Sequence, residues 1–167
     1  MSDTKSENAV NQLLTDDAKV NALDFVAYLE TNGITPKMGR NETFCYQNKT
    51  ICSVYIKGAD HIASPWLIWL SDIEGDEIGL IDIPVDENLK EFAWKHINTC
   101  AHFSSNGESC GCDKSPGRSV VVFGRKFNNV CHSTLSFENP NVESLALVKK
   151  LVELMKPGII NNTINVC

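Results

Sequence analysis

The residues of this chain that are best suited to chemistry are a cluster of cysteines with histidines beside it. Four of the seven cysteines lie close together in the second half of the chain: Cys100, Cys110, Cys112 and Cys131. Three histidines accompany them: His96, His102 and His132. Thiolate and imidazole bind zinc well, and four such ligands can close a tetrahedral structural site. We therefore predict a structural zinc held by the four cysteines, with His102 and His132 as alternative ligands.

The spacing of the cysteines limits the metal chemistry that they support. It follows C-x9-C-x-C-x18-C and lacks the paired C-x2-C units of a zinc ribbon. An iron–sulfur cluster would use the same thiolates, but the C-x2-C-x2-C spacing is absent, so we favour zinc. No H-E-x-x-H or P-loop motif occurs, and the letters G-x-S-x-G occur only at 107–111, inside the polar cysteine-rich segment and not at a predicted strand-to-helix turn. We therefore expect a structural metal, no catalytic residues and a protein that is not an enzyme.

A metal-free alternative uses the same cysteines. Cys110 and Cys112 are one residue apart, so one thiol could resolve a sulfenic acid on the other. Such reactivity requires a lowered thiol pKa, and the basic residues Lys114 and Arg118 are close enough in sequence to contribute to it. A thiol-redox sensor is therefore the runner-up to a zinc domain.

A second alternative is a small-molecule pocket lined by Trp66, Trp69 and Trp94. Aromatic faces with a few polar groups often line such pockets. Against this, Trp66 and Trp69 are three residues apart, and on a regular strand they face opposite sides. Ordinary packing of the three rings is the simpler interpretation.

Composition and charge set further bounds. With 167 residues and 43% hydrophobic content, the chain is long enough for one domain with a substantial core. A net charge of −6 argues against a nucleic-acid partner. We find no signal peptide or membrane-spanning run, so we expect a cytoplasmic protein without a membrane partner, whose thiols stay reduced. The sequence names no partner, and a homodimer is compatible with it.

Apolar periodicity and turn residues predict the secondary structure. In chain order they predict a helix over 15–33, a hairpin over 43–57, strands over 66–70 and 78–85, a helix over 86–97, a hairpin over 119–137 and a helix from Asn139-Pro140-Asn141 to Pro157. This order, αββββαββα, predicts an α+β fold with one mainly antiparallel sheet and helices packed on one face. Cys45 and Cys52, on the first hairpin, are expected as small buried side chains. The run Val120–Phe123 is expected to be covered on both faces.

The same patterns divide the chain into three parts. Residues 1–12 are polar and predict a disordered leader. Residues 13–160 form a single α+β domain that contains a cysteine-rich loop over 98–118, and residues 161–167 form a tail. Loops of this length within a compact domain are usually functional or disordered.

Several segments of the second half carry a resemblance to known sequences. They are W-K-H-I-N-T-C (94–100), C-G-C-D-K-S-P-G-R (110–118), V-F-G-R-K-F-N-N-V-C-H (122–132) and V-K-K-L-V-E-L (148–154). In them the chain resembles a group of small uncharacterised bacterial proteins that are common in anaerobes of the clostridial type. The resemblance runs from the first predicted helix to the last, and it implies a shared fold and shared cysteines. It implies no activity or substrate.

Overall fold

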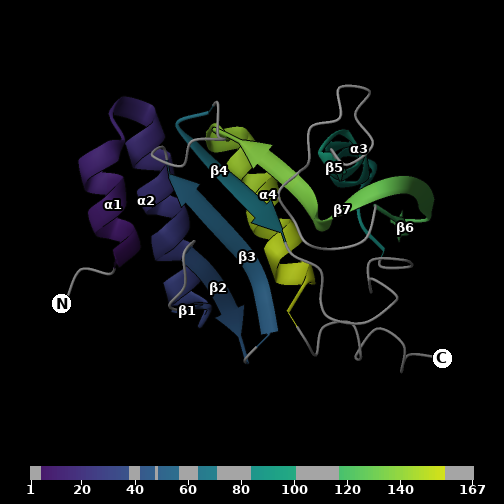
Figure 1. The fold of residues 1–167 in the computed structure, drawn as a ribbon, viewed down its shortest axis with the longest axis horizontal. Coiled ribbons are helices and arrows are strands. Elements are labelled where there is room, and N and C mark those ends of the chain that lie inside the picture. The colour runs from purple at the N-terminus through teal and green to yellow at the C-terminus, as the bar shows by residue number, and fades with distance from the viewer. Residues whose placement is uncertain are drawn as a thin grey trace.

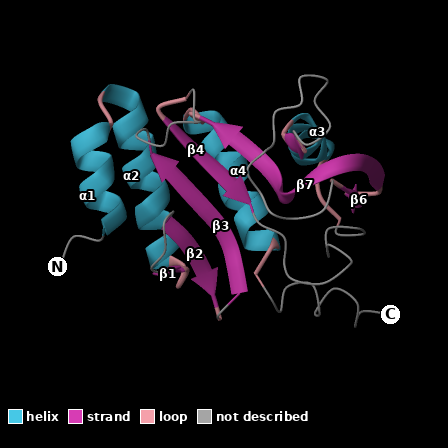
Figure 2. Ribbon diagram, viewed as in Figure 1, coloured by secondary structure: helices cyan, strands magenta, loops and turns pink. Residues whose placement is uncertain are grey.

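The computed structural model describes residues 5–37, 42–47, 49–56, 64–70, 84–100 and 117–156. Within these residues, four helices accompany one sheet of seven strands (Figures 1 and 2). The helices are α1 (Lys5–Leu13), α2 (Asp16–Thr31), α3 (Glu87–Lys95) and α4 (Val142–Leu154). The strands are β1 (Thr35–Lys37), β2 (Glu42–Tyr46), β3 (Lys49–Ile56), β4 (Trp66–Leu70), β5 (Ile97–Thr99), β6 (Arg118–Val122) and β7 (Arg125–Glu138).

The sheet is antiparallel at every described pairing, in the order β1-β2-β3-β4-β7-β5, with β6 also paired to β7. Ile68 of β4 lies opposite Val54 of β3 on one side and Phe137 of β7 on the other. These three side chains are buried and share one face of the sheet, because residues directly opposite one another project to the same side. That face carries the main core.

Helices cover this face of the sheet. The ring of Phe25 on α2 lies 6.5 Å from that of Trp66, and the ring of Phe92 on α3 stacks 5.4 Å from that of Phe137. Helix α4 lies beside α2 behind the strands, as Figure 1 shows, and buries Val148 in the same core. The predicted α+β fold, with one antiparallel sheet and helices on one face, is confirmed.

Helices α3 and α4 begin where the sequence places their caps. The side chain of Asp86 accepts a hydrogen bond from the Leu89 amide at 2.9 Å, and that of Asn141 accepts one from the Ser144 amide at 2.9 Å. Each bond satisfies an amide that has no partner within its helix. Pro140 precedes Asn141, the cap of α4, and therefore lies outside the first turn of the helix.

The predicted disordered leader over residues 1–12 is wrong for most of its length, because Lys5–Leu13 form α1. Val10 is completely buried, and Leu14, which directly follows the helix, is 4% exposed. Residues four apart lie on one side of a helix, so these two apolar side chains suffice to attach an otherwise polar segment to the core.

Other differences from the sequence prediction are local. The short strands β1 and β5 were not predicted. Strand β5 includes Asn98 and Thr99, so the first two residues of the predicted cysteine-rich loop over 98–118 belong to the sheet. Val121 is half-buried, so the strand that we expected to be covered on both faces is covered on one. The strand predicted over 78–85 lies mostly outside the described residues, as does the tail over 161–167.

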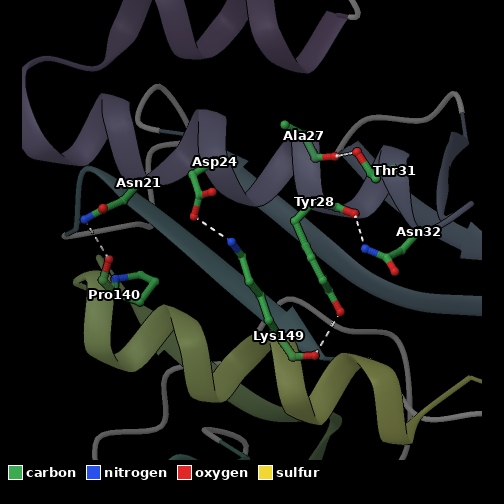
Figure 3. A network of polar contacts seen from close by, with 8 residues as sticks. All are labelled: Asn21, Asp24, Ala27, Tyr28, Thr31, Asn32, Pro140 and Lys149. Atoms are coloured by element: carbon green, nitrogen blue, oxygen red, sulfur yellow. Dashed lines mark hydrogen bonds and ion pairs between the residues drawn. The ribbon is translucent and has the colours of Figure 1, made fainter.

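Polar contacts join α2 to the start and middle of α4 (Figure 3). The side-chain amide of Asn21 donates to the Pro140 carbonyl at 3.3 Å, and the Lys149 ammonium lies 2.6 Å from a carboxylate oxygen of Asp24. The Tyr28 hydroxyl oxygen lies 3.0 Å from the Lys149 carbonyl. These bonds fix the position of α4 along α2.

No helix in the described part of the chain is long and apolar enough to cross a membrane.

Candidate functional site

The candidate metal site lies where β5 and β6 meet the middle of β7. Val130 of β7 lies opposite Thr99 of β5 on one side and Arg118 of β6 on the other. Cys100 follows β5, and its amide donates a hydrogen bond of 2.8 Å to the Asn129 carbonyl. Cys131 is the residue after Val130. The pairing of β5 with β7 therefore brings Cys100 and Cys131 into one small region of the fold.

Gly117, which directly precedes β6, lies against Cys100 and Asn129 in this region. A Cβ atom on Gly117 would lie 2.7 Å from Cys100 Cβ and 2.5 Å from Asn129 Oδ1. Real Cβ atoms essentially never make such contacts, so the absence of a side chain allows this approach. Gly117 and Cys100 flank residues 101–116, and the two described ends of the cysteine-rich segment are thus in contact.

Asn129 has an unusual conformation at this junction. Its backbone φ is +60°, which non-glycine residues adopt mainly when they are Asn or Asp. Its side-chain oxygen is buried and has no hydrogen-bond partner among the described residues. A buried acceptor of this kind is costly unless a donor or a cation satisfies it.

The predicted ligands differ in what the structure says of them. Cys100 is 3% exposed and Cys131 is half-buried. His132 is exposed and, as the neighbour of Cys131 on a strand, projects to the opposite side. Cys110, Cys112 and His102 lie outside the described residues. Within the described part of the chain, no group of three or more His, Cys, Asp or Glu side chains is placed to hold a metal ion.

His96 occupies the C-cap of α3, where its ring is held on both sides. Its Nδ1 lies 2.7 Å from the Phe92 carbonyl, and its ring lies 4.4 Å from that of Phe92 and 4.9 Å from that of Phe137. A carbonyl can only accept, so Nδ1 carries a proton and Nε2 is the acceptor of the neutral ring.

Cys45 and Cys52 are buried, as predicted, at 7% and 0% exposure. Burial raises the pKa of the Cys52 thiol, and the nearby Cys45 raises it further. Thiolates are the reactive form, so Cys52 is a packing residue with no redox chemistry of its own.

The three tryptophans do not come together. Trp66 is completely buried on the face covered by helices, and among the described residues its indole N–H has no partner. Trp69 projects from the other face and donates to the Ser136 hydroxyl at 3.1 Å. Trp94 donates to the Val122 carbonyl at 2.8 Å. Each ring thus serves packing at a different place, and neither described cavity is lined by a tryptophan.

Two neighbouring cavities lie beside the end of α3, and His96 and Glu138 line both. The larger has a volume of about 360 Å³ and is lined by Lys95, His96, Ile97, Asn98, Ser136 and Glu138. The smaller has a volume of about 130 Å³ and reaches the first turn of α4 at Ser144. This polar site could not be predicted from the sequence, because no motif links the residues at the end of α3 and in β5 to the end of β7.

Comparisons of this chain with protein-family models, with curated proteins and with solved structures find no match. The resemblance to the clostridial-type proteins therefore stays a prediction.

Proposed function

We propose that this chain is a small cytoplasmic metal-binding domain. In it, Cys100, Cys110, Cys112 and Cys131 hold a structural zinc, and the domain serves as a binding or sensing module. The observation that carries the proposal is the pairing of β5 with β7, in which Thr99 lies opposite Val130, so that Cys100 and Cys131 are in one region of the fold although 30 residues separate them in sequence.

The surroundings of these two cysteines suit a bound cation. The contact between Gly117 and Cys100 anchors both ends of the segment that carries Cys110 and Cys112. Four thiolates would close the coordination shell, which is the arrangement of a structural site.

The role of such a metal would be local. The core formed by α2, α4 and the sheet contains large apolar side chains such as Phe25, Trp66 and Phe137. None of the three is a strand partner of Thr99 or Val130, the residues next to Cys100 and Cys131. A zinc bound at Cys100 and Cys131 would therefore order the segment between β5 and β6, and the rest of the domain would fold without it.

Native mass spectrometry of the reduced protein tests this proposal directly. We expect one zinc per chain that a strong chelator removes. The Cys131→Ser variant should lose most of the zinc, because a serine hydroxyl is a poor ligand beside thiolates. The matched control, His132→Ala, changes the next residue and should keep it. Zinc loss in the histidine variant with retention in the serine variant would replace Cys131 by His132 as the ligand.

The alternative function is a metal-free module, either a thiol-redox sensor or a small-molecule binder. The polar cavity beside His96 is the observation that favours a small-molecule binder. Reduced protein that carries no zinc, and takes up none when zinc is added, would contradict the metal proposal and leave the alternative in its place.

A further inference from the structure

We propose that the larger cavity beside His96 binds a small zwitterion, a molecule of amino-acid size that carries one ammonium and one carboxylate group. The cavity shares no residue with the candidate metal site, so this inference does not depend on zinc. Its volume of about 360 Å³ lies at the lower end of the range for small-molecule sites.

The cavity lies where β5 stops pairing with β7. Ile97 of β5 lies opposite Leu135, and the Ser136 amide donates to the His96 carbonyl at 3.0 Å. On the other side, β4 continues to pair with β7 as far as Glu138. The last residues of β7 therefore have one open edge, which the end of α3 borders.

Two opposite charges line this cavity without pairing with each other. Lys95 stands in the last turn of α3, and Glu138 ends β7. Neither side chain forms an ion pair with any residue in the described ranges. A ligand with both signs of charge can pair with Lys95 and Glu138 at once. A simple anion would be repelled by the Glu138 carboxylate, and a simple cation would be repelled by the Lys95 ammonium.

Three polar groups of the cavity are already held by the protein. The Ser64 hydroxyl donates to Glu138 Oε2 at 2.8 Å. Ser136 Oγ accepts from the Trp69 indole, which leaves the serine proton available to a ligand carboxylate. The Phe92 carbonyl occupies His96 Nδ1, which leaves Nε2 as the acceptor of the neutral ring. Such preorganisation lowers the entropic cost of binding.

The chemistry of these groups separates the zwitterion from a metal ion. A metal held by His96 and Glu138 would need further protein ligands, and in the part of the chain that the structure describes no third ligand completes such a group. The residues that line the cavity instead include donors suited to a carboxylate, Lys95 and Ser136, and acceptors suited to an ammonium, Glu138 and His96.

Titration followed by NMR tests this proposal, with the Trp69 indole N–H as a reporter. The probes are L-alanine and L-serine, and the controls are acetate and methylamine, which each carry one of the two charges. We expect a saturable shift of the Trp69 indole signal and of the Asn98 amide signal with both amino acids. The Trp69 indole bonds to Ser136, and Asn98 lines the cavity. The Trp66 and Trp94 indole signals should stay in place.

Charge-removing variants assign the two halves of the ligand. Lys95→Gln and Glu138→Gln should each weaken amino-acid binding by about tenfold, as loss of one charged hydrogen-bond partner does. The control variants Glu91→Gln and Lys126→Gln change exposed charges outside the cavity and should not alter binding. All four variants should keep the zinc content of the parent protein. Equal binding of acetate and the amino acids, no saturable shift, or full affinity in Lys95→Gln and Glu138→Gln would each overturn the proposal.

Discussion

Gly117 and Cys100 lie so close together that a methyl group on the glycine would stand 2.7 Å from Cys100 Cβ. The same methyl group would stand 2.7 Å from the backbone carbon of Asn129, which cannot move without disturbing β7. We therefore expect Gly117→Ala to lower the free energy of unfolding by about 1–3 kcal/mol, the usual cost of overpacking. Urea denaturation followed by fluorescence measures this loss.

A matched control for Gly117→Ala is Gly124→Ala in the β6–β7 turn. A Cβ there has no atom within 4 Å, but its φ of +76° is strained for any side chain. We expect a loss of about 1 kcal/mol from this strain alone. Only Gly117→Ala should also reduce zinc content, because only Gly117 touches Cys100. Equal zinc content in Gly117→Ala and Gly124→Ala would show that zinc binding does not depend on the close approach of Gly117 to Cys100.

Removal of metal should loosen one region of the protein. If the cysteines hold zinc, a chelator should increase amide hydrogen exchange around Cys100 and at the facing part of β7, because the Cys100 amide bonds to Asn129 there. Helices α2 and α4 should keep their protection, since they pack against each other and neither helix carries a residue of the candidate metal site. Mass spectrometry of peptides after exchange, with and without chelator, provides the measurement. A uniform loss of protection across the domain would instead make the metal part of the global fold.

The two faces of β6 differ enough for adjacent substitutions to separate them. Val122 is completely buried, whereas Val121 is half-buried. A buried unpaired carboxylate is strongly unfavourable, so Val122→Asp should destabilise the protein by about 3 kcal/mol or more. Val121→Asp should cost roughly 1 kcal/mol, because its carboxylate can reach water. Thermal unfolding of both variants checks the order, which is reversed if β6 turns its other face to the core.

Glu153 on α4 should contribute stability that depends on pH. Burial opposes its ionisation, but hydrogen bonds from Lys156 at 2.8 Å and from the Tyr28 hydroxyl outweigh this effect and lower the pKa of the carboxyl below its usual 4.5. A group whose pKa is lower in the folded state stabilises the fold above its unfolded pKa and loses that effect as the pH falls through its folded value.

Glu153→Gln tests this linkage. The substitution should cost less than about 1 kcal/mol at neutral pH, because the carboxylate is partly exposed and solvent screens it. Below pH 4.5 the difference between variant and parent should shrink as Glu153 itself becomes protonated. Glu143→Gln, on the exposed first turn of α4, is the control. If the difference in free energy of unfolding between Glu153→Gln and the parent grew in acid, the pKa of Glu153 would be raised in the folded state instead of lowered.

Local sequence signals determined most of the secondary structure. The side chains of Asp86 and Asn141 cap α3 and α4 where they stand in the sequence, and Gly33 ends α2 with a φ of +71°. Such caps depend on neighbouring residues only, so they can be read from the chain. Helix α1 could not, because Val10 forms part of an apolar face only when α2 and the sheet lie against it.

The candidate sites divide in the same way. The sequence by itself determined which residues have suitable chemistry, and strand alternation already put Trp66 and Trp69 on opposite faces. Only the tertiary structure decided that Cys100 lies against Asn129 and Gly117, and that Lys95 shares a cavity with Glu138. These contacts arise from the pairing of β5 and β6 with β7, whose register shifts at irregular positions such as Asn129. No short turn joins β5 to β7, so their register depends on packing across the sheet and on long-range hydrogen bonds, and irregular positions shift it further.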